Sequence, residues 1–219
     1  MTRSNGASDS IATLRQLRII GLLDAAERLG ATPLPLIPLH TIAYFTDALA
    51  PVWNLPIIDG QILKRLRPYY PSLQADLDRL VGRGVVAASE VHYVREEPHW
   101  RLDANYALNR QFADRILAVV ESFPMRAGEL GFVREVVYAA SGLGVEGLQT
   151  VTELDATYSD PLVDVGGMIE VERDPGEANN LTAQVALRFG ELLDGESTVS
   201  TAEMVNLYMR RLYARTQVA

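Results

Sequence analysis

Three cations, Lys64, Arg65 and Arg67, lie close together in the sequence "GQILKRLRPYYPSLQADLDRLVGRGVV", and Lys64 is the only lysine in the chain. Cations in front of a helix can hold nucleic-acid phosphates, pair with the acids of a partner protein, or keep a strand edge solvated. All three interpretations stay open. In an extended segment alternate side chains share a face, so Arg65 and Arg67 are expected to point outward together.

The same alternation predicts that Ile62 and Leu66 point inward, with Lys64 extending past them. Tyr69 and Tyr70 follow the cations directly, and tyrosine and arginine are both favoured at protein interfaces. The candidate DNA or partner contacts are therefore Lys64, Arg65, Arg67, Tyr69, Tyr70 and, from the next helix, Arg79.

The helix expected to begin at Pro71 lacks the residues of a DNA recognition helix. A recognition helix needs exposed Arg, Lys, Asn or Gln side chains aimed at base edges. Its expected exposed positions are instead Gln74, Asp76, Asp78 and Arg79. Two acids facing phosphates oppose binding, so sequence-specific readout is not expected.

Residue patterns of known catalytic and metal sites do not occur in the sequence. The chain has no cysteine, and its histidines, His40, His92 and His99, lie in different expected elements without metal-ligand spacing. The acids of "ELDATYSDPLVD" match no calcium loop and are expected to be solvated. We therefore predict a non-enzymatic protein with no cofactor and no metal, against the alternative of an enzyme with a scattered site.

The charge is divided unevenly along the 219 residues, which carry a formal net charge of −8. Residues 1–110 hold 12 cations and 11 acids, whereas residues 111–219 hold 8 cations and 17 acids. The first half can thus face a polyanion, and the second suits a basic partner. The N-terminus lacks the apolar core of a signal peptide and no apolar run is long enough to span a bilayer, so a cytoplasmic location is expected.

The pattern of helices and strands predicts an α+β, predominantly helical fold. After a disordered tail at 1–10, helices beginning at Ser10, Pro38 and Pro71 precede two strands over 84–94 and 99–109. This order is typical of a winged helix over 11–108, with a generic α+β hairpin domain as the alternative. An acidic helical domain is expected over 109–219, with helices at 110–123, 129–143, 176–193 and 201–213; residues 145–175 are left unassigned.

The segment from Leu39 to Gly84 also resembles a known family. The L-x-x-x-A-Y-F helix (Leu39 to Phe45), Asn54-Leu55-Pro56, the Tyr69-Tyr70-Pro71 turn and the L-x-x-L-x-x-x-G helix (Leu77, Leu80, Gly84) are similar to the middle component of bacterial ABC-three-component systems. More distantly, they resemble the Panacea antitoxin domain. The resemblance covers roughly residues 11–108.

The resemblance implies an adaptor subunit that links an SMC/Rad50-like ABC ATPase to an effector in antiphage or anti-plasmid defence, with DNA contacted only within the complex. It brings no catalytic residue. The excess of acids after residue 110, with apolar helices at 110–123 and 201–213, predicts binding to an ATPase head, or self-association, through the C-terminal half. The alternative is a winged-helix transcription regulator or antitoxin.

Overall fold

Helix α2 (Leu36–Ala48) lies at the centre of the molecule because nearly every one of its residues is buried. The computed structural model describes residues 3–96, 99–171, 180–193 and 199–217. Against α2 pack α1 (Arg3–Arg28) and α5 (Pro124–Ser141), and α3 (Pro71–Gly82) contacts it through Gln74 and His40. Because α2 is buried on all sides, its polar residues His40 and Asp47 included, it lies within the core rather than at its edge.

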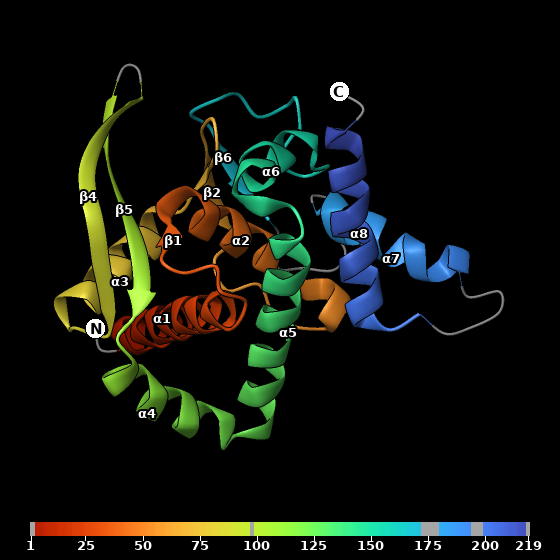
Figure 1. Ribbon diagram of the computed structural model, residues 1–219. Helices are drawn as coiled ribbons and strands as arrows, with labels where there is room; N and C mark the ends of the chain where they lie inside the picture. Colours follow the sequence, from red (N-terminus) through yellow and green to blue (C-terminus); the bar gives the residue numbers. More distant parts are fainter. Residues whose placement is uncertain (1–2, 97–98, 172–179, 194–198, 218–219) are drawn as a thin grey trace.

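A long β-hairpin covers one side of this core. Its strands, β4 (Val86–Glu96) and β5 (His99–Leu108), pair antiparallel, and the short β1 (Leu34–Pro35) adds to the other edge of β5. The expected hairpin is confirmed. Figure 1 shows it running along one side of the molecule, with its tip at one end and α4 (Arg110–Glu121) at the opposite end.

A second sheet joins residues that are far apart in the chain. Its strands are β2 (Gln61–Lys64), β3 (Pro68–Tyr69) and β6 (Met168–Glu170), in the order β3-β2-β6 with antiparallel pairing. The pairing of Ile62 with Ile169 crosses the expected boundary at 108/109. One hydrophobic core also contains residues from both sides of that boundary.

The remaining helices stand on the other side of α2. They are α6 (Gly144–Thr150), α7 (Leu181–Leu193) and α8 (Thr201–Thr216), with the short 3-10 helices η1 (Ala50–Trp53) and η2 (Val151–Leu154) between elements. The unassigned segment therefore contains α6, η2 and β6. At the start of α8, Ser200 and Glu203 form the expected capping box.

Two expectations about the N-terminal helices change. Helix α1 begins at Arg3, so Ser10 is not its N-cap and the residues from Arg3 onward are not a disordered tail. The predicted order of three helices and a hairpin is present, but β2, β3 and β6 intervene as a second sheet. The α+β class is confirmed, while the winged-helix assignment stays a prediction. Within the described part, no helix is long and apolar enough to cross a membrane.

Candidate functional site

The outer half of the hairpin carries apolar side chains on a face that the body does not cover. Tyr93 lies directly opposite Leu102, and Arg95 lies opposite Trp100. Since side chains two residues apart share a face, Trp100 and Leu102 continue the row of β5 that is buried further on at Tyr106. The core-facing row of this strand thus extends beyond the core.

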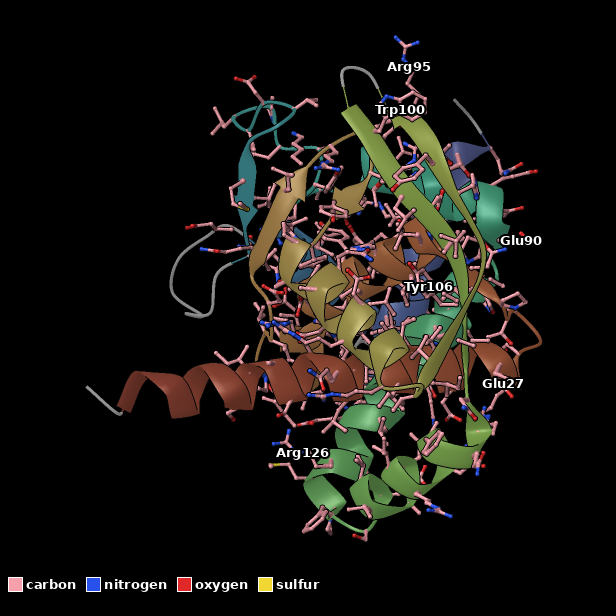
Figure 2. All side chains as sticks on the ribbon, turned by 90° about the vertical axis from the view of Figure 1, so that its left-hand side faces the viewer. Glu27, Glu90, Arg95, Trp100, Tyr106 and Arg126 are labelled. Carbon is pink, nitrogen blue, oxygen red and sulfur yellow. The ribbon has the colours of Figure 1, made fainter. Side chains whose placement is uncertain are left out.

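Exposure along this row is high. Tyr93 is 70% exposed and Trp100 66% exposed, and Leu102 and Val91 beside them are also exposed. Figure 2 shows Trp100 and Arg95 at the free end of the hairpin. Val91, Tyr93, Trp100 and Leu102 are called the hairpin surface below. Exposed apolar side chains gathered on one face make this surface a candidate interaction site.

A β-bulge separates the exposed half of the hairpin from its buried half. The register shifts between Ser89 and His92, and Glu90 adopts a positive φ of 52°. The Asn105 side chain donates a hydrogen bond of 2.6 Å to the Glu90 carboxylate across the strands. Bulges increase the local twist, so this one sets the direction in which the outer half projects.

A second exposed apolar surface lies at the corner between α4 and α5. Helix α4 buries only Ala113 and Leu117, although the helix is strongly amphipathic. Val119 is 61% exposed, and Phe112, Phe123 and Met125 are exposed beside it. Phe112, Val119, Phe123 and Met125 are called the corner surface below. In Figures 1 and 2 the corner lies at the end of the molecule opposite the hairpin tip.

Asp24 of α1 fixes the position of this corner. Its buried carboxylate accepts hydrogen bonds from Arg28 at 2.8 Å, Arg110 of α4 at 2.8 Å and Arg134 of α5 at 3.3 Å. Burial opposes its ionisation, but the hydrogen bonds from Arg110, Arg28 and Arg134 outweigh this effect and hold the pKa of Asp24 below its ordinary value. One acid therefore joins three helices.

A groove runs between the N-terminal half of α1 and α4. Its volume is about 620 Å³, and its lining residues are Ser10, Thr13, Leu14, Leu17, Arg115, Ile116, Val119, Val120, Phe123 and Arg126. A smaller cavity of about 70 Å³ shares Leu14, Leu17, Val120 and Arg126 with the groove. The two spaces therefore adjoin.

The floor of the smaller cavity holds a buried ion pair. Arg18 Nη1 donates to Asp47 Oδ1 at 2.5 Å, and both side chains are almost completely buried. Burial raises the pKa of Asp47, since the attraction of Arg18 does not fully offset desolvation. Such a pair is costly to break because a single charge would remain in an apolar surrounding.

The predicted contact residue Lys64 is used inside the fold. Its Nζ donates hydrogen bonds to the carbonyl oxygens of Asp160 at 2.6 Å and Val163 at 2.7 Å. Its backbone N–H donates to Gly167 O at 2.8 Å. The single lysine thus holds the loop that precedes β6.

Arg65 and Arg67 do not form the predicted outward pair. The Arg65 guanidinium lies over the Tyr69 ring, 4.4 Å from its centroid, and Tyr69 stacks on His40. Arg67 donates to Glu153 Oε1 at 2.6 Å, and its side chain is only 18% exposed. Each cation has a partner within the chain.

The predicted orientation of Leu66 is wrong. Ile62 is buried as expected, but Leu66 is 65% exposed, because β2 ends at Lys64 and strand alternation does not extend to Leu66. Tyr70, predicted as a candidate contact, is completely buried, and its backbone N–H donates to His40 Nδ1 at 3.2 Å.

The expected exposure of Asp76 on α3 is also wrong. Asp76 is completely buried and accepts hydrogen bonds from Arg15 at 2.7 Å and from Arg79, the last predicted contact, at 2.6 Å. Burial opposes ionisation, but hydrogen bonds from Gln16, Arg15 and Arg79 hold the pKa of Asp76 below its ordinary value. The acid therefore binds α3 to α1.

Asp155, expected in a solvated loop, is completely buried instead. Its carboxylate accepts hydrogen bonds from the hydroxyls of Tyr44, Tyr208 and Thr182, the last two at 2.5 and 2.9 Å. The backbone N–H groups of residues 157 and 158 also donate to it at 3.0 Å. All its acceptor positions are used inside the protein, so the carboxylate ties α2, α7 and α8 together.

No group of three or more His, Asp or Glu side chains suited to a metal ion occurs within the described ranges. No protein-family model, curated protein or solved structure matches the chain. The hairpin and corner surfaces are the functional candidates that sequence patterns missed. The available signal was length, since a strand of 10 residues with an apolar side chain at every second position extends past a small core.

Proposed function

We propose that this protein is a non-enzymatic adaptor that holds two partner proteins at once. The observation that carries the proposal is the presence of two exposed apolar surfaces, the hairpin surface and the corner surface, at opposite ends of the molecule. A bridge between two proteins needs two separate docking surfaces, and a rigid body between them fixes their distance.

Residue type supports docking at both surfaces. Tryptophan, tyrosine and phenylalanine bury a large area and dominate the binding energy of protein interfaces. Trp100 and Tyr93 supply them at the hairpin, and Phe123 and Phe112 at the corner. Leaving four aromatic rings in water is unfavourable unless a partner covers them.

The partners that we propose are an ABC ATPase and an effector of a prokaryotic defence complex. The resemblance of residues 39–84 to the middle component of ABC-three-component systems supports this choice. Lys64 and Arg67 each bind a partner inside the protein, Asp160 O and Glu153 respectively. This supports a protein-binding role over direct binding of DNA. A winged-helix regulator would need unpaired cations on α3, whereas Arg79, although 56% exposed, pairs with the buried Asp76.

Co-purification with the proteins encoded by neighbouring genes tests the proposal. Trp100→Ser and Phe123→Ser each remove one exposed aromatic side chain. Each should change the free energy of unfolding by no more than about 0.5 kcal/mol. We expect each variant to lose a different partner while the other stays bound. Tyr138→Ser is the matched control, since Tyr138 is an exposed aromatic residue outside both surfaces. Retention of both partners by both variants would refute the adaptor.

A further inference from the structure

The groove between α1 and α4 has a distinct charge pattern. The only charged residues among those that line it are two arginines, Arg115 and Arg126. Arg126 pairs with both carboxylate oxygens of Glu129, at 2.8 and 2.7 Å. Arg115 is exposed and makes no hydrogen bond or ion pair with the residues that the structure describes. Among the side chains that the structure describes, the groove therefore offers one positive charge without a paired acid.

The shape of the groove matches a helix. Leu14 and Leu17 form one wall from α1, and Ile116 and Val119 of α4, with Phe123 at the start of α5, form the other. The spacing of three residues between Leu14 and Leu17 and between Ile116 and Val119 is that of a ridge along a helix, against which the side chains of another helix can pack. An apolar groove between two helices is a common receptor for an amphipathic helix.

The smaller cavity adjoining the groove can hold one anchoring side chain. Leu130, Phe132 and Val133 of α5 line it beside the shared residues. Its volume of about 70 Å³ is too small for a drug-sized ligand, which needs at least about 300 Å³. A small apolar side chain from a docked helix fits such a recess, whereas a phenylalanine ring is too large for it.

We infer that this groove binds an acidic amphipathic helix of a partner protein, with its apolar stripe against α1 and α4 and its acids beside Arg115. This inference rests on the proposed adaptor function and specifies the partner element at the corner surface. Acid opposite an uncompensated arginine is the complementary charge, whereas a basic helix would meet repulsion there.

Titration of the full-length protein with synthetic helices tests the inference. The probe is a fluorescein-labelled peptide of about 18 residues, long enough for helix formation once docked, with leucines at spacings of three and four and glutamates elsewhere. Its counterparts carry lysine in place of glutamate, or the glutamate sequence scrambled. By fluorescence anisotropy, the glutamate helix should bind at least tenfold more tightly than either counterpart.

Substitutions in the groove sharpen the assay. Arg115→Glu should weaken the glutamate helix at least tenfold and strengthen the lysine helix, and Val119→Glu should abolish binding of the glutamate helix. Arg188→Glu on α7 changes an exposed arginine far along the chain and should have no effect. Equal binding of the acidic and basic helices, or binding that survives Val119→Glu, overturns the inference.

Two outcomes separate this inference from the adaptor function. If Val119→Glu loses a co-purified partner but no helix binds, the acidic-helix inference fails and the adaptor remains. If sedimentation shows a wild-type dimer that Val119→Glu converts to monomer, a second copy occupies the groove and the inference is wrong. If the glutamate helix binds but no protein co-purifies, the inference that the groove binds an acidic helix is supported and the adaptor function is refuted.

Discussion

The cationic segment at Lys64 to Arg67 and the outer half of the hairpin are opposite in what they offer to a partner. In the cationic segment, Lys64 binds backbone carbonyls and Arg67 binds Glu153, so charge that looks available is used internally. In the hairpin, Trp100 and Tyr93 look like ordinary strand residues but remain exposed. Internal partners satisfy a charge readily, whereas an apolar face can be covered only by another surface.

The same contrast extends to the acids. Asp24, Asp76 and Asp155 are buried and fully engaged, although aspartate is a typical surface residue. Each accepts hydrogen bonds from different elements and so joins helices. The polar groups hold this fold together, and the apolar groups at its two ends remain for binding. The following experiments test that division.

The largest effect is expected from the Asp155 centre. Asp155→Ala removes the acceptor of two tyrosine hydroxyls and Thr182 and leaves these donors buried without partners. We expect a loss of about 3–5 kcal/mol in the free energy of unfolding, measured by urea denaturation. Asp164→Ala, at an exposed acid nearby, should change it by less than about 0.5 kcal/mol. Equal effects would show that Asp155 is not structural.

A slightly smaller effect is expected from pH acting on His40. Burial lowers the pKa of His40 to about 4 from its ordinary value of 6.5. The unfolded chain takes up a proton below 6.5, whereas the folded protein does so only near 4. The free energy of unfolding should therefore fall by about 3 kcal/mol as the pH drops through that range.

Urea denaturation at several pH values between 7.5 and 4 measures this dependence. His40→Gln should remove this loss of stability at low pH, because the buried imidazole whose pKa is lowered on folding is then absent. His92→Gln, at an exposed histidine, should leave the dependence unchanged. The same slope in both variants would contradict the assignment to His40.

An intermediate effect is expected from Lys64→Met. The substitution keeps the stem of the side chain but removes the donor to the carbonyls of Asp160 and Val163. We expect a loss of about 1–3 kcal/mol in the free energy of unfolding. Gln61→Met on the same strand, at an exposed position, serves as the control. Unchanged stability of Lys64→Met together with weakened DNA binding would instead support the predicted contact of Lys64 with DNA.

The smallest effect is expected from the double variant Arg65→Ala/Arg67→Ala. Loss of the Glu153 ion pair should cost about 1 kcal/mol or less, since Glu153 is largely exposed. Binding of the free protein to duplex DNA should be weak and unchanged. Titrations at several salt concentrations, with and without the ATPase, check this. A salt slope reduced by about one unit per arginine would assign phosphate contacts to this pair.

Local sequence signals predicted much of the secondary structure. Pro71 at the start of α3, the Ser200–Glu203 capping box and the alternation in β4 and β5 each depend on neighbours in the chain. Such features follow from backbone stereochemistry and side-chain period, which no distant residue needs to supply. The mixed α+β class could therefore be predicted without knowledge of the tertiary structure.

The functional surfaces and the buried acids were decided only by tertiary structure. Whether Asp155 is solvated depends on Tyr44 and Tyr208, far away in sequence, and whether Arg67 is available depends on Glu153. Likewise, nothing local distinguishes Trp100, which is exposed, from Tyr106, which is buried on the same strand face. The sequence alone determined which residues could form helices, strands and caps. Long-range packing determined which of them are covered, because burial is a property of the whole chain.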